Sequence, residues 1–310
     1  MKYPICYLIL CHNNLQNIQS LLEVLYSDDA YFVIHIDKKC KEDFSFLYVY
    51  QNVYIVPERV SITWGNITVV DAVLKLSEYA LEKVPFAHNY CLLSGADYPM
   101  KSHDYIKSYL KVHEGVDFIM GTAFPSEETQ WIEGGRRRLE AYVVFLNAHS
   151  NATIEPRRFT LENFKQFCKV LFVNYRCLPR ALQIWMSYPK RRFPVNFQPY
   201  AGEMWWVLTK ETLKDTIKWN NNHPEYYKYH LDSQIPDEMY INSIVCNLSH
   251  SVCHEIKRYI SWEKKTDMSP RWLCAEDWEL IKDCIENPEI LFIRKVKDER
   301  ILKLISDELK

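Results

Sequence analysis

The feature that most constrains the fold of this chain is the alternation of short apolar runs with longer amphipathic segments over residues 1–112. The apolar runs are rich in Ile, Val, Tyr and Leu, and they predict strands over residues 3–10, 31–36, 53–56 and 90–93. The segments between them carry apolar residues at three- and four-residue spacing, which predicts helices over 15–25, 68–81 and 103–112. This βαβα order predicts an α/β fold with a mainly parallel central sheet flanked by helices.

The rest of the chain shows a less regular pattern, punctuated by Trp, Arg and Pro. It predicts strands over 204–208 and 257–262, and helices over 161–172, 209–219, 236–246, 275–287 and 297–308. There is no internal repeat, low-complexity segment or Gly/Ser-rich linker, and the chain has seven glycines in all. A single domain over residues 1–310 is therefore predicted.

Charge and hydropathy exclude several classes of protein. A net charge of −2 and an isoelectric point of about 6.6 argue against nucleic-acid binding, which usually requires a basic excess. The run from Arg136 to Arg138 is too short to change that conclusion. No apolar stretch reaches the roughly 18 residues that span a bilayer, and the N-terminus has no charged leader or small-residue cleavage site. A cytoplasmic protein is expected, with peripheral membrane association left open.

The ten cysteines form no CxxC pair, which argues against a thioredoxin-like motif or a zinc ribbon, and we expect buried thiols. There is also no glycine-rich phosphate loop of the GxGxxG or GxxxxGK[ST] type, so any phosphate would be bound by side chains. The GxSxG and HExxH motifs are absent, so no motif indicates a hydrolase or a zinc protease.

Polar residues cluster where the first four predicted strands end, and ligands of open α/β sheets bind at that edge. The clusters are His12, residues 35–39, residues 57–59 and residues 94–99. The last cluster predicts a tight strand-to-helix turn, in which Asp97 either caps local amides or faces the cleft. Because no second carboxylate stands in a DxD pair with Asp97, a bound divalent ion is disfavoured.

Two further patterns could carry chemistry. Pro236 suits the first turn of a helix, and Asp237 and Glu238 would then interact favourably with the helix dipole. Adjacent helical residues point about 100° apart, so only one of these carboxylates would face a substrate. Trp205 and Trp206 are adjacent on a predicted strand, so one would lie in the core and the other could face the cleft.

Taken in order, these segments resemble the core-2/I-branching glycosyltransferase family, which includes β-1,6-N-acetylglucosaminyltransferases and peptide xylosyltransferases. The resemblance rests on residues 7–12, 31–39, 61–64, 90–101, 202–208, 236–238, 269–271 and 291–295. It implies a GT-A-like fold, with a nucleotide-sugar-binding half over 1–112 and an acceptor, catalytic and C-terminal part over 113–310.

The resemblance also implies roles for individual residues. Glu238 would be the catalytic base, and Arg271 and Lys295 would neutralise the diphosphate in place of a metal ion. His12, Asp37 and Lys39 would bind the donor. Arg136, Arg138 and Trp205 are the expected acceptor-side residues.

The implied activity is an inverting, metal-independent transfer of GlcNAc from UDP-GlcNAc to a hydroxyl of a glycan acceptor, which forms a β-linkage such as β-1,6. The UDP-sugar is a co-substrate, and no other cofactor is expected. Polysaccharide biosynthesis is one setting for such an activity. Two alternatives stay open: a xylosyltransferase that uses UDP-xylose, and a sugar- or nucleotide-binding protein without turnover, in which Glu238 serves only its helix.

Overall fold

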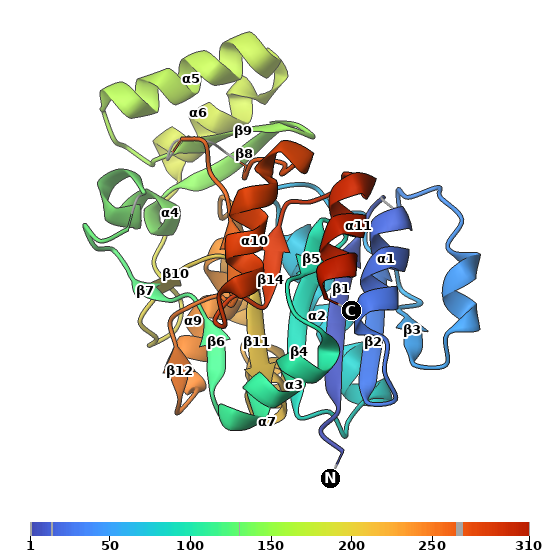
Figure 1. The fold of residues 1–310 in the computed structure, drawn as a ribbon. Helices are drawn as coiled ribbons and strands as arrows, with labels where there is room; N and C mark the ends of the chain where they lie inside the picture. Colours follow the sequence, from blue (N-terminus) through green and yellow to red (C-terminus); the bar gives the residue numbers. More distant parts are fainter. Residues whose placement is uncertain (1, 14, 130, 265–268, 310) are drawn as a thin grey trace.

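The computed structural model describes residues 2–13, 15–129, 131–264 and 269–309. Its centre is a seven-stranded sheet in the order β12–β6–β11–β4–β1–β2–β3 (Figure 1). The strands are β1 (Ile5–Cys11), β2 (Ala30–Ile36), β3 (Val53–Ile55), β4 (Asn89–Ser94), β6 (Asp117–Ile119), β11 (Trp206–Thr209) and β12 (Val252–Cys253). All neighbouring pairs are parallel except those of β11, which runs antiparallel to β4 and β6. The predicted α/β class with a mainly parallel sheet is confirmed.

Helices cover both faces of this sheet (Figure 1). One face carries α1 (Leu15–Leu25), α3 (His103–Val112), α10 (Trp278–Glu286) and α11 (Glu299–Glu308). The other carries α2 (Thr68–Lys83), α7 (Lys210–Asn222) and α9 (Tyr240–Leu248). Every residue of β1 is buried, because side chains alternate between the faces and both faces are covered. The strand therefore reads as a continuous apolar run.

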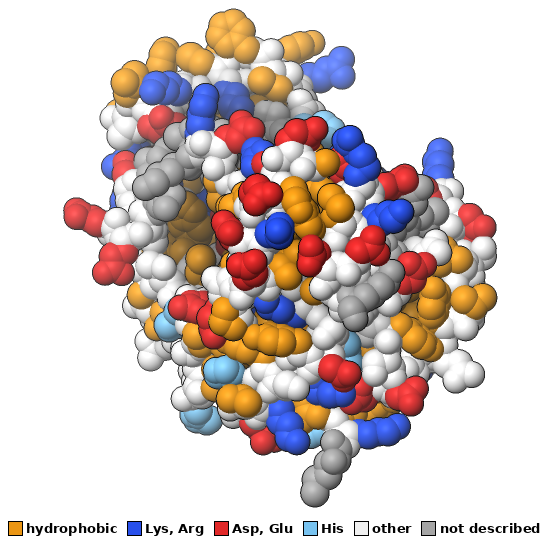
Figure 2. Space-filling model, in the orientation of Figure 1, with side chains coloured by type: hydrophobic (Ala, Val, Ile, Leu, Met, Phe, Trp, Pro, Cys, Tyr) orange, Lys and Arg blue, Asp and Glu red, His pale blue; other side chains and the backbone are white. Residues whose placement is uncertain are grey.

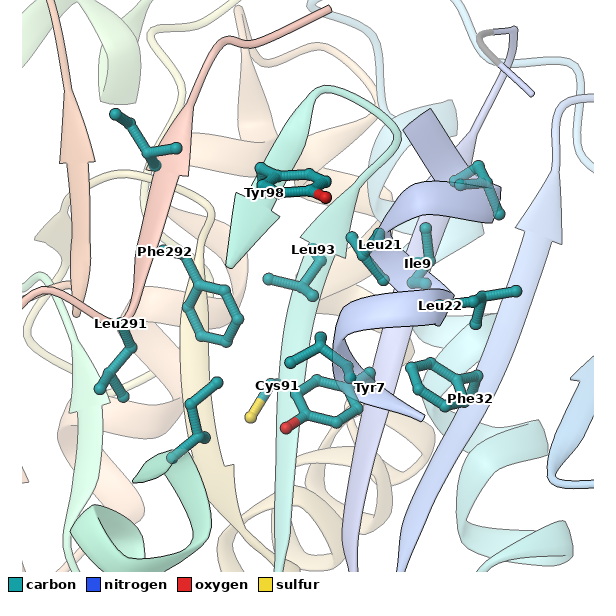
Figure 3. Packing of buried hydrophobic residues seen from close by; sticks show 14 of the residues in the cluster. Tyr7, Ile9, Leu21, Leu22, Phe32, Cys91, Leu93, Tyr98, Leu291 and Phe292 are labelled. Atoms are coloured by element: carbon teal, nitrogen blue, oxygen red, sulfur yellow. The ribbon is translucent and has the colours of Figure 1, made fainter. Parts of the chain in front are cut away.

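A second, three-stranded sheet in the order β13–β14–β5 joins the C-terminal part of the chain to the first half. It consists of β13 (Arg258–Ile260), β14 (Phe292–Arg294) and β5 (Asp97–Pro99). Residues 94–99 were expected to form only a strand-to-helix turn, but 97–99 pair antiparallel with β14. Figure 3 shows Phe292 of β14 packed near Tyr7 and Cys91 of the central sheet.

A lobe formed by residues 142–187 lies to one side of the sheet, at the top of Figure 1. It contains the hairpin β8 (Tyr142–Asn147) and β9 (Ser150–Ile154), followed by α5 (Leu161–Asn174) and α6 (Leu178–Ser187). The lobe has a small hydrophobic core of its own, which includes Val144, Ile154, Val170 and Ile184. Of these elements, the sequence pattern predicted only α5.

Shorter elements complete the chain. They are β7 (Thr122–Ala123), β10 (Tyr200–Ala201), α4 (Arg136–Glu140), α8 (Pro224–His230), and the 3-10 turns η1 (Ser45–Val49), η2 (Ile132–Gly135), η3 (Tyr175–Cys177), η4 (Pro236–Glu238) and η5 (Ala275–Asp277). The helix predicted over 236–246 is divided into η4 and α9, because Met239 leaves the helical region with φ −143°. Four cysteines are buried and six are partly buried. Within the described ranges, no helix is long and apolar enough to cross a membrane.

Candidate active site

A cleft of about 640 Å³ lies beside α4, β7 and η4, and Figure 2 shows this face of the molecule hollowed below the lobe. Its lining combines aromatic and apolar side chains with a few charged groups, a composition typical of a ligand site. The residues that line it include Trp64, Met120, Thr122, Glu128, Thr129, Trp131, Arg138, Gly202, Glu203, Ile235, Glu238 and Trp262. Two predicted site residues, Glu238 and Arg138, are therefore in the same cleft.

Backbone contacts on both sides fix the position of Glu238. Ile235, just before η4, adopts φ +48°, and its N–H donates to the carbonyl of Gly65 at 3.1 Å. The carbonyl of Glu238 accepts from the N–H of Gly202 at 2.9 Å. Pro236 opens the turn, where its missing N–H costs nothing. This turn directs the Glu238 side chain into the cleft while leaving it about one third exposed.

The Glu238 carboxylate is paired with a cation from a different element. Oε2 of Glu238 lies 2.8 Å from Nη1 of Arg138 on α4. The Arg138 guanidinium also stacks on the ring of Trp131 at 3.9 Å, a favourable cation–π arrangement. Arg138 is thus held by an ion pair and an aromatic ring, and it in turn orients the carboxylate.

Two further carboxyl groups lie close to Glu238. Burial raises the pKa of Glu203 to about 7, the charge of Glu238 adds to that shift, and Arg294 and Arg258 oppose it. Burial, reinforced by Glu238, also raises the pKa of Asp237 to about 7. Oδ1 of Asp237 is buried without a hydrogen-bond partner among the described residues. Of the adjacent pair, Glu238 is therefore the carboxylate that faces the cleft.

A network of buried charge lies behind Glu203. Asp97 is completely buried, and its two oxygens lie 3.2 Å from Nε of Arg258 and 3.4 Å from Nη1 of Arg294. Both guanidinium groups stack on Trp205, at 4.7 Å and 4.2 Å from the ring centre. The backbone N–H of Ser94 donates to Asp97 as well. Asp97 therefore holds two arginines that come from β13 and β14.

This placement changes the interpretation of Trp205. Its side chain was expected on the acceptor side of the cleft, but it is only 5% exposed and packs beneath the two arginines. A ring that stacks on a sugar needs an open face. Trp206 is also buried, so neither tryptophan faces the cleft, although the two side chains point to opposite sides of the chain. Both faces of this strand are covered by protein.

The predicted donor-binding residues gather at the carboxyl ends of β1 and β2. Burial lowers the pKa of His12; Asp37 opposes the shift, whereas Arg294 and Lys39 reinforce it, which places these charges around the imidazole. Asp37 is buried and accepts from the N–H groups of Lys39 at 2.7 Å and Ile62 at 3.3 Å. Asp37 thus orders the loop next to His12, while His12 and the end of the Lys39 side chain stay accessible.

The two cations predicted for the diphosphate differ in their surroundings. Nζ of Lys295 donates to Oγ of Ser269 at 2.6 Å, and burial, with Arg294 next to it, lowers the pKa of the Lys295 amine. Arg271 instead forms two bonds to Asp277, at 2.6 Å and 3.1 Å. The charge of Arg271 is therefore already balanced by a carboxylate, whereas Lys295 lies beside a second cation.

Arg136, like Trp205, was expected on the acceptor side of the cleft but lies outside it. It pairs with Glu133 and Glu140 and lies 3.5 Å from Glu155, so it belongs to an acidic cluster outside the cleft lining. Successive residues of a helix point in different directions, which explains why Arg138 reaches the cleft and Arg136 does not.

Sequence reasoning missed Glu203, Arg258 and Arg294. Arg294 directly precedes Lys295, and Glu203 follows Gly202 at the start of a predicted strand, so both lay within segments already singled out. Nothing local indicated that Asp97 would pair with an arginine 197 residues away. In the part of the chain that the structure describes, no three His, Cys, Asp or Glu side chains are grouped to hold a metal ion.

Comparison with known proteins identifies the family to which the sequence is similar. The sequence profile of the family described as Core-2/I-Branching enzyme matches residues 5–282. A β-1,3-galactosyl-O-glycosyl-glycoprotein β-1,6-N-acetylglucosaminyltransferase 4 from Danio rerio is 23% identical over 245 residues, which is 76% of this chain and 48% of the relative.

Two other relatives match over shorter stretches of the chain. The human β-1,3-galactosyl-O-glycosyl-glycoprotein β-1,6-N-acetylglucosaminyltransferase 3 is 27% identical over 42% of this chain and 31% of its own length. Xylosyltransferase 1 from Canis lupus familiaris is 24% identical over 37% of this chain and 13% of its own length. The chain thus spans less than half the length of each of these three relatives.

Proposed function

Because the chain belongs to the core-2/I-branching enzyme family, we propose that it is an inverting glycosyltransferase that moves GlcNAc from UDP-GlcNAc to a hydroxyl of a glycan acceptor. The observation that carries this proposal is the Glu238–Arg138 pair, 2.8 Å apart in a cleft lined by aromatic side chains. Aromatic and apolar walls with a few fixed polar groups suit a sugar, and the carboxylate can take a proton.

In the proposed reaction, Glu238 accepts the proton of the acceptor hydroxyl as that oxygen attacks the anomeric carbon from the face opposite the diphosphate. The new C–O bond forms as the bond to the diphosphate oxygen breaks, so an α-linked donor gives a β-linkage. General-base assistance of this kind contributes about 10²- to 10⁴-fold. Arg138 keeps the carboxylate in position throughout.

The leaving diphosphate needs positive charge, which we assign to Lys295, with His12 and Lys39 nearby, because the neighbouring Arg294 is already paired with the buried Asp97. Fixed cations that point at developing negative charge stabilise a transition state. A single well-placed hydrogen-bond donor contributes about 3–4 kcal/mol. Arg271 keeps its proposed role only if the diphosphate displaces Asp277 from its guanidinium. A metal ion has no part in this proposal, and a cytoplasmic location stays a prediction.

A donor screen tests the proposal. Millimolar UDP-GlcNAc should raise the melting temperature more than UDP-xylose does, and UDP should be released, in EDTA, when a panel of oligosaccharide acceptors is added. A larger shift with UDP-xylose would make the chain a xylosyltransferase, the family's other activity. Binding of a donor without turnover on any acceptor would favour the non-catalytic alternative, and loss of turnover in EDTA would show that a metal is needed.

A further inference from the structure

Helix α5 carries an apolar stripe on the side that faces solvent. Leu161, Phe164, Cys168 and Leu171 follow one another at intervals of three, four and three residues, and Phe172 borders the stripe. This spacing places them along one side of the helix. Phe164 is 65% exposed and Phe172 is 89% exposed. Figure 2 shows hydrophobic side chains along the upper edge of the molecule, where Figure 1 places α5 and α6.

The stripe is not what holds α5 in the lobe. Another side of the helix does so, since Val170 is buried against the β8–β9 hairpin and α6, and Phe167 packs on the same cluster. The exposed apolar surface continues beyond α5. Further exposed side chains of the lobe are Phe159, Val173, Tyr175 and Met186. An exposed apolar patch of this extent, on a helix already anchored elsewhere, marks an interaction surface.

The charge around this patch is strongly positive. Residues 157–192 contain nine Lys and Arg, one of them buried, and one acidic residue, Glu162, in a chain whose net charge is −2. Lys165 and Lys169 are exposed on α5 beside the stripe, and Arg176 and Arg180 are exposed just after it. Figure 2 shows Lys and Arg side chains close to the hydrophobic ones at this end of the molecule.

We propose that the α5–α6 lobe docks on an anionic lipid surface, with the α5 stripe inserted at the level of the headgroups. An amphipathic helix with Phe and Leu on one side and Lys or Arg beside them is the pattern of interfacial membrane binding. Anionic lipids would balance the positive charge, as they do for basic segments near membranes. A second copy of this chain is disfavoured as the occupant, because it would bring two positively charged surfaces together.

Docking in this way would bring the candidate active site to the lipid surface. Strand β8 begins two residues after the end of α4, the helix that places Arg138 in the cleft. An acceptor glycan attached to a lipid carrier would then be presented next to Glu238. This consequence rests on the proposed function, whereas the docking itself does not.

Vesicle flotation of the full chain tests the docking without any activity assay. The probes are vesicles of pure phosphatidylcholine and vesicles that contain phosphatidylglycerol as about one third of the lipid. The chain should float with the anionic vesicles and not with the neutral ones, and 0.5 M NaCl should reduce the bound fraction because it screens the charges. Failure to float with anionic vesicles at low salt would overturn the proposal.

Variants test whether vesicle binding depends on α5 or is unspecific. The double variant Phe164→Glu/Phe172→Glu and the variant Lys165→Ala/Lys169→Ala should each lower the partition coefficient at least about tenfold. The matched control is Val112→Glu, because Val112 is 82% exposed at the end of α3, far from α5 in the sequence, and it should bind as the wild type does. Circular dichroism melts check that each variant is folded.

Two further results would overturn the proposal. Equal loss of binding by Val112→Glu would show that vesicle binding is unspecific, and the proposal would fail. A concentration-dependent dimer in light scattering that Phe164→Glu/Phe172→Glu abolishes, without vesicle binding by the wild type, would show that the stripe pairs with a second copy. Donor-induced stabilisation is measured in parallel, so loss of the proposed function and loss of docking are distinguished.

Discussion

The chemistry of the site depends on three carboxyl groups with different surroundings. Glu238 is partly exposed and paired with Arg138, whereas burial raises the pKa values of Asp237 and Glu203 to about 7. A general base has to be within reach of the acceptor hydroxyl, and that geometry comes before its pKa. On geometry, Glu238 is the proposed base, and the other two carboxyls lie close to it.

We expect Glu238→Gln to lower turnover by at least about 10²-fold, because the amide has almost the same size but cannot accept the proton. Stabilisation by UDP-GlcNAc should persist, since the donor cations are unchanged. UDP release and thermal shift measure the two quantities. Should Glu203→Gln abolish turnover while Glu238→Gln leaves it nearly normal, the base would be Glu203.

The raised pKa of Asp237 predicts how stability depends on pH. In the unfolded chain this carboxyl ionises near its ordinary value of 3.8, but in the folded protein it keeps its proton to about pH 7. The folded state therefore binds more protons over this window, and its stability falls as the pH rises from about 4 to 7.

Asp237→Asn removes this ionisation, so the melting temperature of the variant relative to the wild type should increase between pH 5 and pH 8. Melting curves at the two pH values give the difference. Asp215→Asn, at an exposed aspartate, is measured in parallel as the control for the loss of one carboxylate. A flat difference for Asp237→Asn would contradict the assigned burial of this carboxyl.

At the scale of elements, the cleft exists because η4 lies close to the loop between β10 and β11. Gly202 permits this approach: its N–H donates to the Glu238 carbonyl, and an added Cβ would lie 2.3 Å from the carbonyl oxygen of Met120. Asn242 fills the adjacent space, with its amide bound to Met120 and Glu203 carbonyls. There is no room for a side chain at position 202.

Gly202→Ala should therefore destabilise the protein by about 1–3 kcal/mol, the usual cost of overpacking, and should also lower turnover through the displaced Glu238 turn. Denaturant unfolding measures the first effect. Gly95→Ala is a suitable comparison for stability, because its Cβ would meet ordinary contacts from 3.4 Å. Equal stability of both variants would show that the Gly202 loop can move aside.

For the whole molecule, the contact between the two ends of the chain matters most. Phe292 of β14 packs in the same buried cluster as Tyr7 of β1, with ring centres 6.5 Å apart (Figure 3). The strand that carries Arg294, and the Lys295 that follows it, are thereby fixed against the sheet that carries His12. The candidate site is assembled from both ends of the sequence.

Phe292→Ala should reduce the free energy of unfolding by about 3–5 kcal/mol, since a buried aromatic ring is lost and a cavity is left. Phe172→Ala, which truncates an exposed ring, should change it by no more than about 0.5 kcal/mol. Urea titration of both variants measures the difference. A small effect of Phe292→Ala would mean that β14 does not couple the C-terminal part to the central sheet.

Much of the fold could be predicted because the signals are local. The apolar run of β1 and the three- and four-residue spacing of α2 are readable within a single segment, and the structure confirms both. The β8–β9 hairpin was missed, since it lies in a stretch with no regular alternation of strands and helices. Strand β5 was missed because three residues become a strand only when β14 is beside them.

The site divides in the same way. The sequence by itself determined the α/β class, a helical turn that begins at Pro236 and the cations at the strand ends, because residue type and spacing carry that information. Only the tertiary structure decided that Arg138 rather than Arg136 meets Glu238, that Asp277 neutralises Arg271, and that Trp205 lies under Arg258 and Arg294. These pairings join residues far apart in the chain, or choose between neighbours on one helix, and the packed fold alone fixes which side chains meet.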